Sequence, residues 1–170
     1  TSDRSIAIDQ LIRTRPDEVR YSRENYSIQE SRNMNYHGAK AFILDKLEKE
    51  LPRQLTYHSL NHTLDVLYTT EELCRIERIP PYETILLKTA ALYHDSGFLI
   101  TNQDHERKGC DLVKEYLPGY DYPPSAIESI CGMIMATKVP QSPQNYLEAI
   151  LCDADLDYLG RDDFYTIGAT

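Results

Sequence analysis

The chain has 170 residues, of which 41% are hydrophobic and 26% charged, and its formal net charge at pH 7 is −9. This length favours one domain that buries its own core, and the acidic charge argues against nucleic-acid binding, which depends on a basic surface. No apolar run approaches the roughly 18 residues that span a membrane, and the start TSDRSIAIDQ lacks the apolar segment of a secretory signal, so we expect a cytoplasmic protein without a membrane partner.

Residues 1–33 differ in composition from the rest of the chain. Arg, Asp, Glu, Ser and Asn dominate, and apolar residues are sparse after Ile12. Such a segment cannot bury a core, so we expect an N-terminal arm or linker with at most a short helix near residues 6–12. It would follow an upstream domain or dock on a partner subunit of a homo-oligomer.

Beyond Tyr36 the apolar residues recur with helical spacing, and strand-like alternation never persists. Prolines and glycines punctuate the pattern, and the segment 83–94 is apolar enough to be central. The sequence therefore predicts an all-α bundle of about six or seven helices. The expected helices cover residues 36–51, 60–78, 83–94, 104–116, 125–137 and 145–156, and a short last one begins near Arg161.

Four cysteines lie far apart in the sequence, and no two of them form a C-x-x-C pair. All four fall in expected helices, which favours buried, reduced thiols over disulfides or a zinc site. These cysteines are Cys74, Cys110, Cys131 and Cys152.

His58 and His62 stand four residues apart in TYHSLNHTLDVL. If this segment is helical, both rings project from one face, a spacing typical of two metal ligands or of a ligand and an acid. His58 lies at the expected helix start, so it need not bind the same ion as His62. Two surface histidines are the alternative.

The dipeptide His94-Asp95 ends the apolar stretch AALYHDSGFL. A neutral imidazole and a carboxylate are good ligands for a divalent cation, which would explain both groups at the edge of a core. A hydrogen-bonded pair at a helix end is the alternative.

Three aspartates, Asp153, Asp155 and Asp157, lie in or beside the apolar stretch ILCDADLDYLG. A buried carboxylate without a partner is costly, so one of the three is a candidate ligand. A solvated acidic helix end is the alternative, and it is the expected state of Asp157, Asp162 and Asp163.

The order His62, His94-Asp95, Asp155 resembles the H…HD…D pattern of the HD superfamily of metal-dependent phosphohydrolases. The segments HTLDVLYTTEEL, ALYHDSGF and CDADLDYLG carry the resemblance, which covers about residues 55–165. It implies an HD-domain-like helical bundle over residues 34–170. It also implies one divalent metal ion (Mn, Mg, Fe, Ni, Co or Zn) held by His62, His94, Asp95 and Asp155.

The motif YHSLNH, followed by HD and Ala-Asp-Leu, is similar to the catalytic core of cyclic-nucleotide phosphodiesterases, a branch of the same superfamily. This resemblance makes His58 the general acid and His62 a ligand. It selects Asp155 over Asp153 as the last ligand and leaves Asp153 to orient a ligand or a water. No histidine follows His105, so a second ion would depend mainly on a bridging Asp95 and waters.

Four further residues are weighed for a role near the metal. His105 is a candidate for binding phosphate or shuttling a proton, with a surface histidine at a helix start as the alternative. Lys138 and Arg161 are candidate phosphate contacts or solvated cations, and His37 is taken as non-functional.

The resemblance implies a phosphohydrolase, either a phosphomonoesterase or a phosphodiesterase, that acts on a nucleotide or another small phosphate ester. Metal-activated water would be the nucleophile, Asp95 would hydrogen-bond the attacking hydroxide, and His58 or His105 would protonate the leaving group. A regulatory HD module that binds metal or nucleotide within a larger signalling protein is the alternative. An HD enzyme of another reaction type, such as an oxygenase or a hydratase, ranks last, because diiron oxygenases of this fold need extra histidines.

Overall fold

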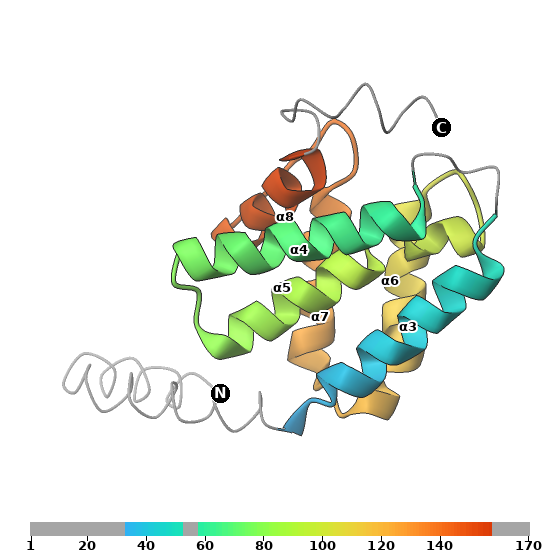
Figure 1. Cartoon of the computed structure of the whole chain (residues 1–170), viewed down its shortest axis with the longest axis horizontal. Coiled ribbons are helices and arrows are strands. Elements are labelled where there is room, and N and C mark those ends of the chain that lie inside the picture. Colours follow the sequence, from blue (N-terminus) through green and yellow to red (C-terminus); the bar gives the residue numbers. More distant parts are fainter. Residues whose placement is uncertain (1–32, 53–57, 158–170) are drawn as a thin grey trace, which may run out of the picture.

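The computed structural model describes residues 33–52 and 58–157, which form six α-helices and two short 3₁₀ helices with no strand among them (Figure 1). The all-α bundle predicted from the sequence is thereby confirmed. The expected arm before residue 33 and the expected helix near Arg161 lie outside the described residues. The elements are α3 (Tyr36–Glu50), α4 (Leu60–Ile76), α5 (Pro81–Tyr93), η1 (Ser96–Leu99), α6 (His105–Tyr116), η2 (Leu117–Tyr120), α7 (Pro124–Ala136) and α8 (Tyr146–Leu156).

The helices begin where short polar side chains or prolines satisfy the first turn. Asn35, Ser59 and Asn145 each accept a hydrogen bond from a backbone N–H of the helix that follows. Proline occupies the first position of α5 and α7, where its missing N–H costs nothing. Each helix therefore lies within a few residues of the position that the periodicity predicted.

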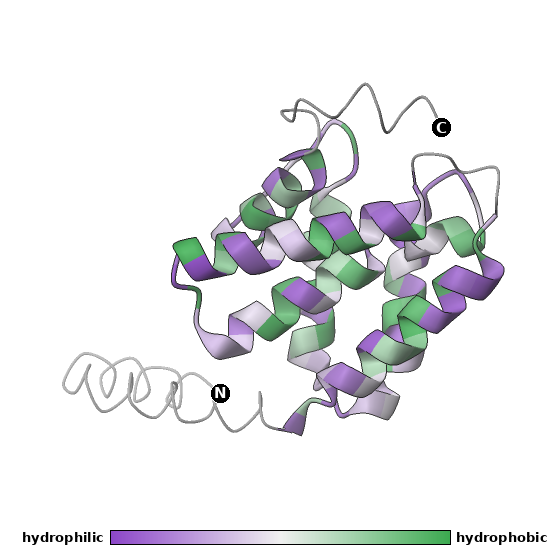
Figure 2. Ribbon diagram, viewed as in Figure 1, coloured by the Kyte–Doolittle hydropathy of each residue, from purple (hydrophilic) through white to green (hydrophobic). Residues whose placement is uncertain are grey.

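Helix α5 lies at the centre of the bundle and packs against α3, α4, α7 and α8 (Figure 1). Its inward residues are almost fully buried, and Figure 2 shows apolar residues along the part of α5 that approaches its C-terminal end. Figure 2 shows polar and apolar residues interspersed along α3 and α4. The central position expected for segment 83–94 is confirmed. As a result, the His94-Asp95 pair at the end of this segment lies in the interior. The buried residues of α5 are Leu86, Leu87, Thr89, Ala90, Ala91, Leu92 and Tyr93.

Just after α5 the chain makes a tight corner through η1 and packs onto the start of α6. A Cβ atom on Gly97 would lie 1.8 Å from the backbone oxygen of His105, closer than any real contact allows. Only glycine permits this approach, which brings the end of α5 and the start of α6 together.

The four cysteines are free, and each lies in a helix as expected. Three of them are buried and Cys131 is half-buried, so full burial was wrong for that residue. No described helix combines the length and the apolar composition needed to cross a bilayer.

We expect Gly97→Ala to lower the free energy of unfolding by about 1–3 kcal/mol, because the added methyl group must push η1 away from α6. Urea denaturation followed by circular dichroism measures this change. Gly119→Ala is the matched control, since a Cβ at Gly119 meets no atom within 4 Å. Equal stability of the two variants would contradict the proposed close contact.

Candidate metal centre

Four predicted ligands from separate parts of the sequence meet at one point. His62 lies in the first turn of α4, His94 caps the end of α5, Asp95 follows it, and Asp155 lies in the last turn of α8. His62 Nε2 lies 3.3 Å from His94 Nε2, 3.6 Å from Asp95 Oδ2 and 3.2 Å from Asp155 Oδ1. His94 Nε2 lies 3.4 Å from each of the same two carboxylate oxygens.

These spacings fit the coordination shell of a small divalent cation. A tetrahedron or octahedron with ligand atoms about 2.1 Å from its centre separates neighbouring ligand atoms by about 3.0–3.4 Å. The ligand atoms of His62, His94 and Asp155 all lie within 4.8 Å of one another, as do those of His58, His62 and Asp95. Two imidazole nitrogens and two carboxylate oxygens suit Mn²⁺, Fe²⁺, Zn²⁺ and their neighbours.

The ring of His94 is held in the orientation that a ligand needs. Its Nδ1 lies 2.8 Å from the backbone oxygen of Ala91, and a carbonyl oxygen can only accept, so Nδ1 carries the proton. The lone pair of Nε2 then points into the cluster. With 1% of its surface exposed, His94 has no alternative position in solvent.

The two carboxylates of the cluster are ionised. Burial raises the pKa of Asp95, but the rings of His94, His105 and His58 outweigh it and hold the pKa well below its ordinary value. Burial acts in the same direction on Asp155, and contacts with His62 and His94 again lower its pKa.

The cluster attracts positive charge. Burial lowers the pKa of His94, yet the carboxylates of Asp95 and Asp155 raise it well above its ordinary value. Two ionised carboxylates in a buried site are costly without a compensating cation. A dication supplies that charge while the imidazoles stay neutral, so the residues present fit a divalent metal ion.

His58 precedes α4, whose N-cap is Ser59, so it does not share a helix face with His62. Its ring still reaches the cluster, because Nδ1 donates a hydrogen bond of 2.7 Å to Asp95 Oδ2. The side chain of His58 is 34% exposed, which leaves it accessible from solvent.

His105, at the start of α6, approaches the other oxygen of the same carboxylate. Its Nε2 lies 3.5 Å from Asp95 Oδ1 and 3.5 Å from Glu106 Oε1. The side chain of His105 is 19% exposed, so it is not the surface histidine of the alternative interpretation. Asp95 is thus bordered by imidazoles on both of its oxygens.

Two neighbours of the cluster have no counterpart among the residues predicted from the sequence. The ring of Phe98 stacks on those of His105 and His58, at centroid distances of 3.9 Å and 4.3 Å. Gln141 Nε2 lies 3.4 Å from Asp155 Oδ2 and so holds the oxygen that faces away from His62. Phe98 looked like an ordinary core residue and Gln141 like part of a polar loop, so neither gave a signal.

The other described candidates contribute no ligand atom to the cluster. Asp153 is exposed and lies two positions from Asp155, so the two side chains point to different sides of α8. His37 and Asp157 are exposed. Lys138 is paired with Asp104. Arg161, Asp162 and Asp163 lie outside the described residues.

Comparison with known proteins gives one match. The sequence model of the HD domain matches residues 59–156, which begin at the N-cap of α4 and end with α8. The match spans more than half of the chain and contains all four residues of the cluster. Searches of curated proteins and of solved structures give no significant match.

We expect the purified protein to retain about one divalent ion per chain, and His94→Ala or Asp155→Asn to reduce this to near zero. Elemental analysis after metal loading and desalting measures the stoichiometry. His37→Ala, on an exposed face of α3, is the control and should keep the metal. Full occupancy in either ligand variant would contradict the assignment of the centre.

Proposed function

The chain belongs to the HD domain family, and from this premise we propose that it is a metal-dependent phosphohydrolase acting on a nucleotide or another small phosphate ester. The convergence of two imidazoles and two carboxylates, with further histidines beside them, carries this proposal. A divalent ion bound there supplies Lewis-acid polarisation of a phosphoryl oxygen and lowers the pKa of a coordinated water.

Asp95 would have two tasks at once. Oδ2 lies on the side of the ligands His62 and His94, and Oδ1 faces His105. Because the carboxylate is ionised, it accepts hydrogen bonds and can orient the attacking hydroxyl group. This supports the role expected for Asp95 as both a ligand and a catalytic residue.

His58 is the better candidate for protonating the leaving group. Its Nδ1 donates to Asp95, so Nε2 is the nitrogen that would deliver a proton to the leaving oxygen. Stacking on Phe98 limits the ring to one plane, and its 34% exposure lets a substrate approach.

His105 is better suited to holding Asp95. It is less exposed than His58, and its Nε2 lies between two carboxylates, those of Asp95 and Glu106. A proton on this nitrogen would be attracted by both carboxylates and would be poorly placed to leave for a substrate. We therefore assign His105 to positioning the Asp95 carboxylate.

The test is a panel of nucleoside monophosphates, cyclic nucleotides, dinucleotides and generic phosphate esters, each assayed with Mn²⁺, Mg²⁺, Fe²⁺, Ni²⁺, Co²⁺ and Zn²⁺. We expect metal-dependent release of product from at least one member. His58→Asn should lower kcat by about 10²- to 10⁴-fold, the usual contribution of a general acid, while the bound metal stays.

His37→Asn is the control for the loss of a histidine and should retain the wild-type kcat. A metal-loaded wild-type protein that releases no product from any member would contradict the proposal and favour a regulatory HD module without turnover.

A further inference from the structure

An ion pair joins two loops that lie far apart in the sequence. Lys138, at the end of α7, donates from Nζ to Asp104 Oδ1 in the loop before α6. Both side chains are accessible, with 48% and 63% of their surfaces exposed. Such a pair contributes little to stability and exchanges partners at little cost.

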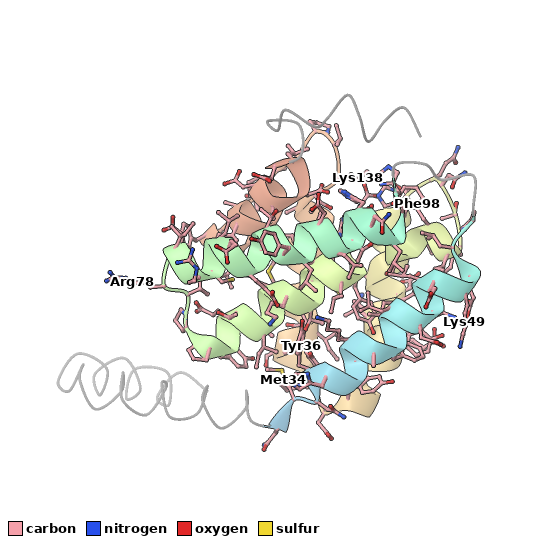
Figure 3. The ribbon with its side chains drawn as sticks, in the orientation of Figure 1. Met34, Tyr36, Lys49, Arg78, Phe98 and Lys138 are labelled. Atoms are coloured by element: carbon pink, nitrogen blue, oxygen red, sulfur yellow. The ribbon has the colours of Figure 1, made fainter. Side chains whose placement is uncertain are left out.

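Both loops border the metal centre. Asp104 directly precedes His105, which faces Asp95. Three residues beyond Lys138, the side chain of Gln141 contacts Asp155. The segment 138–141 therefore runs from the His105 side of the centre to its Asp155 side, and Figure 3 places Lys138 at the same end of α4 as Phe98.

Several carboxylates lie at this border. Asp95, Asp155 and Glu106 carry carboxylates at the centre, and the whole chain has a net charge of −9. A phosphate ester is itself an anion, so it needs a cation besides the metal ion to offset this field. Because Asp104 directly precedes His105, its ion pair with Lys138 places the ammonium group on the His105 side of the centre.

Asp104, the N-cap residue of α6, pairs with the lysine and not with its own helix. Its backbone has φ 51°, in the left-handed region, which aspartate adopts more readily than most residues other than glycine. Its side chain makes no capping bond to α6, so the carboxylate is left to the lysine.

We propose that Lys138 is the residue that binds the phosphate group of the substrate, exchanging the carboxylate of Asp104 for a phosphate oxygen. Asp104 is the positioning residue that keeps the ammonium group at the border of the centre when no substrate is bound. This inference rests on the proposed function and deepens it, because it names a recognition contact for the anionic part of the substrate.

The test compares Lys138→Met, Lys138→Arg and wild-type protein on the best substrate of the panel, and measures binding of inorganic phosphate to the metal-loaded proteins by calorimetry. Lys138→Met should raise KM and the Kd for phosphate about ten-fold or more, because a charge-assisted hydrogen bond is lost. The kcat and the metal content should change little, and Lys138→Arg should recover most of the affinity.

Arg75→Met is the matched control. Arg75 also forms an exposed ion pair, with Glu72, but it lies 13 residues beyond His62 on α4, or about 20 Å along the helix. Figure 3 shows Arg78, close to it in sequence, at the end of the bundle opposite Lys138. Arg75→Met should leave KM and phosphate binding at wild-type values.

A second comparison tests whether Lys138 binds phosphate directly or only joins the two loops through its ion pair with Asp104. In an Asp104→Asn background the ion pair is already broken, and Lys138→Met should still raise KM about ten-fold. If the effect of Lys138→Met disappears in that background, the lysine acts only through Asp104 and the inference is overturned.

The outcomes also distinguish this inference from the proposed function. Turnover by the wild-type protein with an unchanged KM in Lys138→Met overturns the lysine contact alone. A wild-type protein that neither hydrolyses a phosphate ester nor binds phosphate overturns both. Weaker phosphate binding in Lys138→Met supports the contact even where no turnover is found.

Discussion

The carboxylate of Asp95 is the group on which the rest of the site depends. Its Oδ2 faces His58, His62 and His94, while its Oδ1 faces His105. A buried carboxylate needs such partners, because removing the partner of a buried charge destabilises a protein by about 3–5 kcal/mol. The imidazoles keep it ionised, and that charge makes the cluster attractive to a divalent cation.

The fold supplies the position of this carboxylate. Helix α5 is buried on nearly every side, so its last turn delivers the His94-Asp95 pair to the interior. Helices α4 and α8 pack beside α5. Helix α4 brings His62, which precedes His94 by 32 residues, and α8 brings Asp155, which follows His62 by 93 residues. The close approach at Gly97 then folds α6 back, so that His105 reaches the same carboxylate from the other side.

The helices and the four clustered residues could be predicted from the sequence, because apolar periodicity marks helices and the ordered H…HD…D pattern marks the site. The contacts made by loops could not. His58 lies just outside α4, and Gln141 lies in a polar loop. In such segments no hydrophobic periodicity predicts where a side chain points. Apolar periodicity does not distinguish Asp153 from Asp155, and only the Ala-Asp-Leu resemblance selected Asp155, which the helical angle between them turns inward while Asp153 faces solvent.

X-ray absorption spectroscopy of the metal-loaded protein tests the central claim most directly. The account predicts a shell of nitrogen and oxygen ligands with the outer scattering of two imidazole rings, and the loss of one ring's contribution in a His62→Ala variant that is loaded with excess metal. A spectrum without imidazole scattering, or one with sulfur ligands, would contradict a centre built from His62, His94, Asp95 and Asp155.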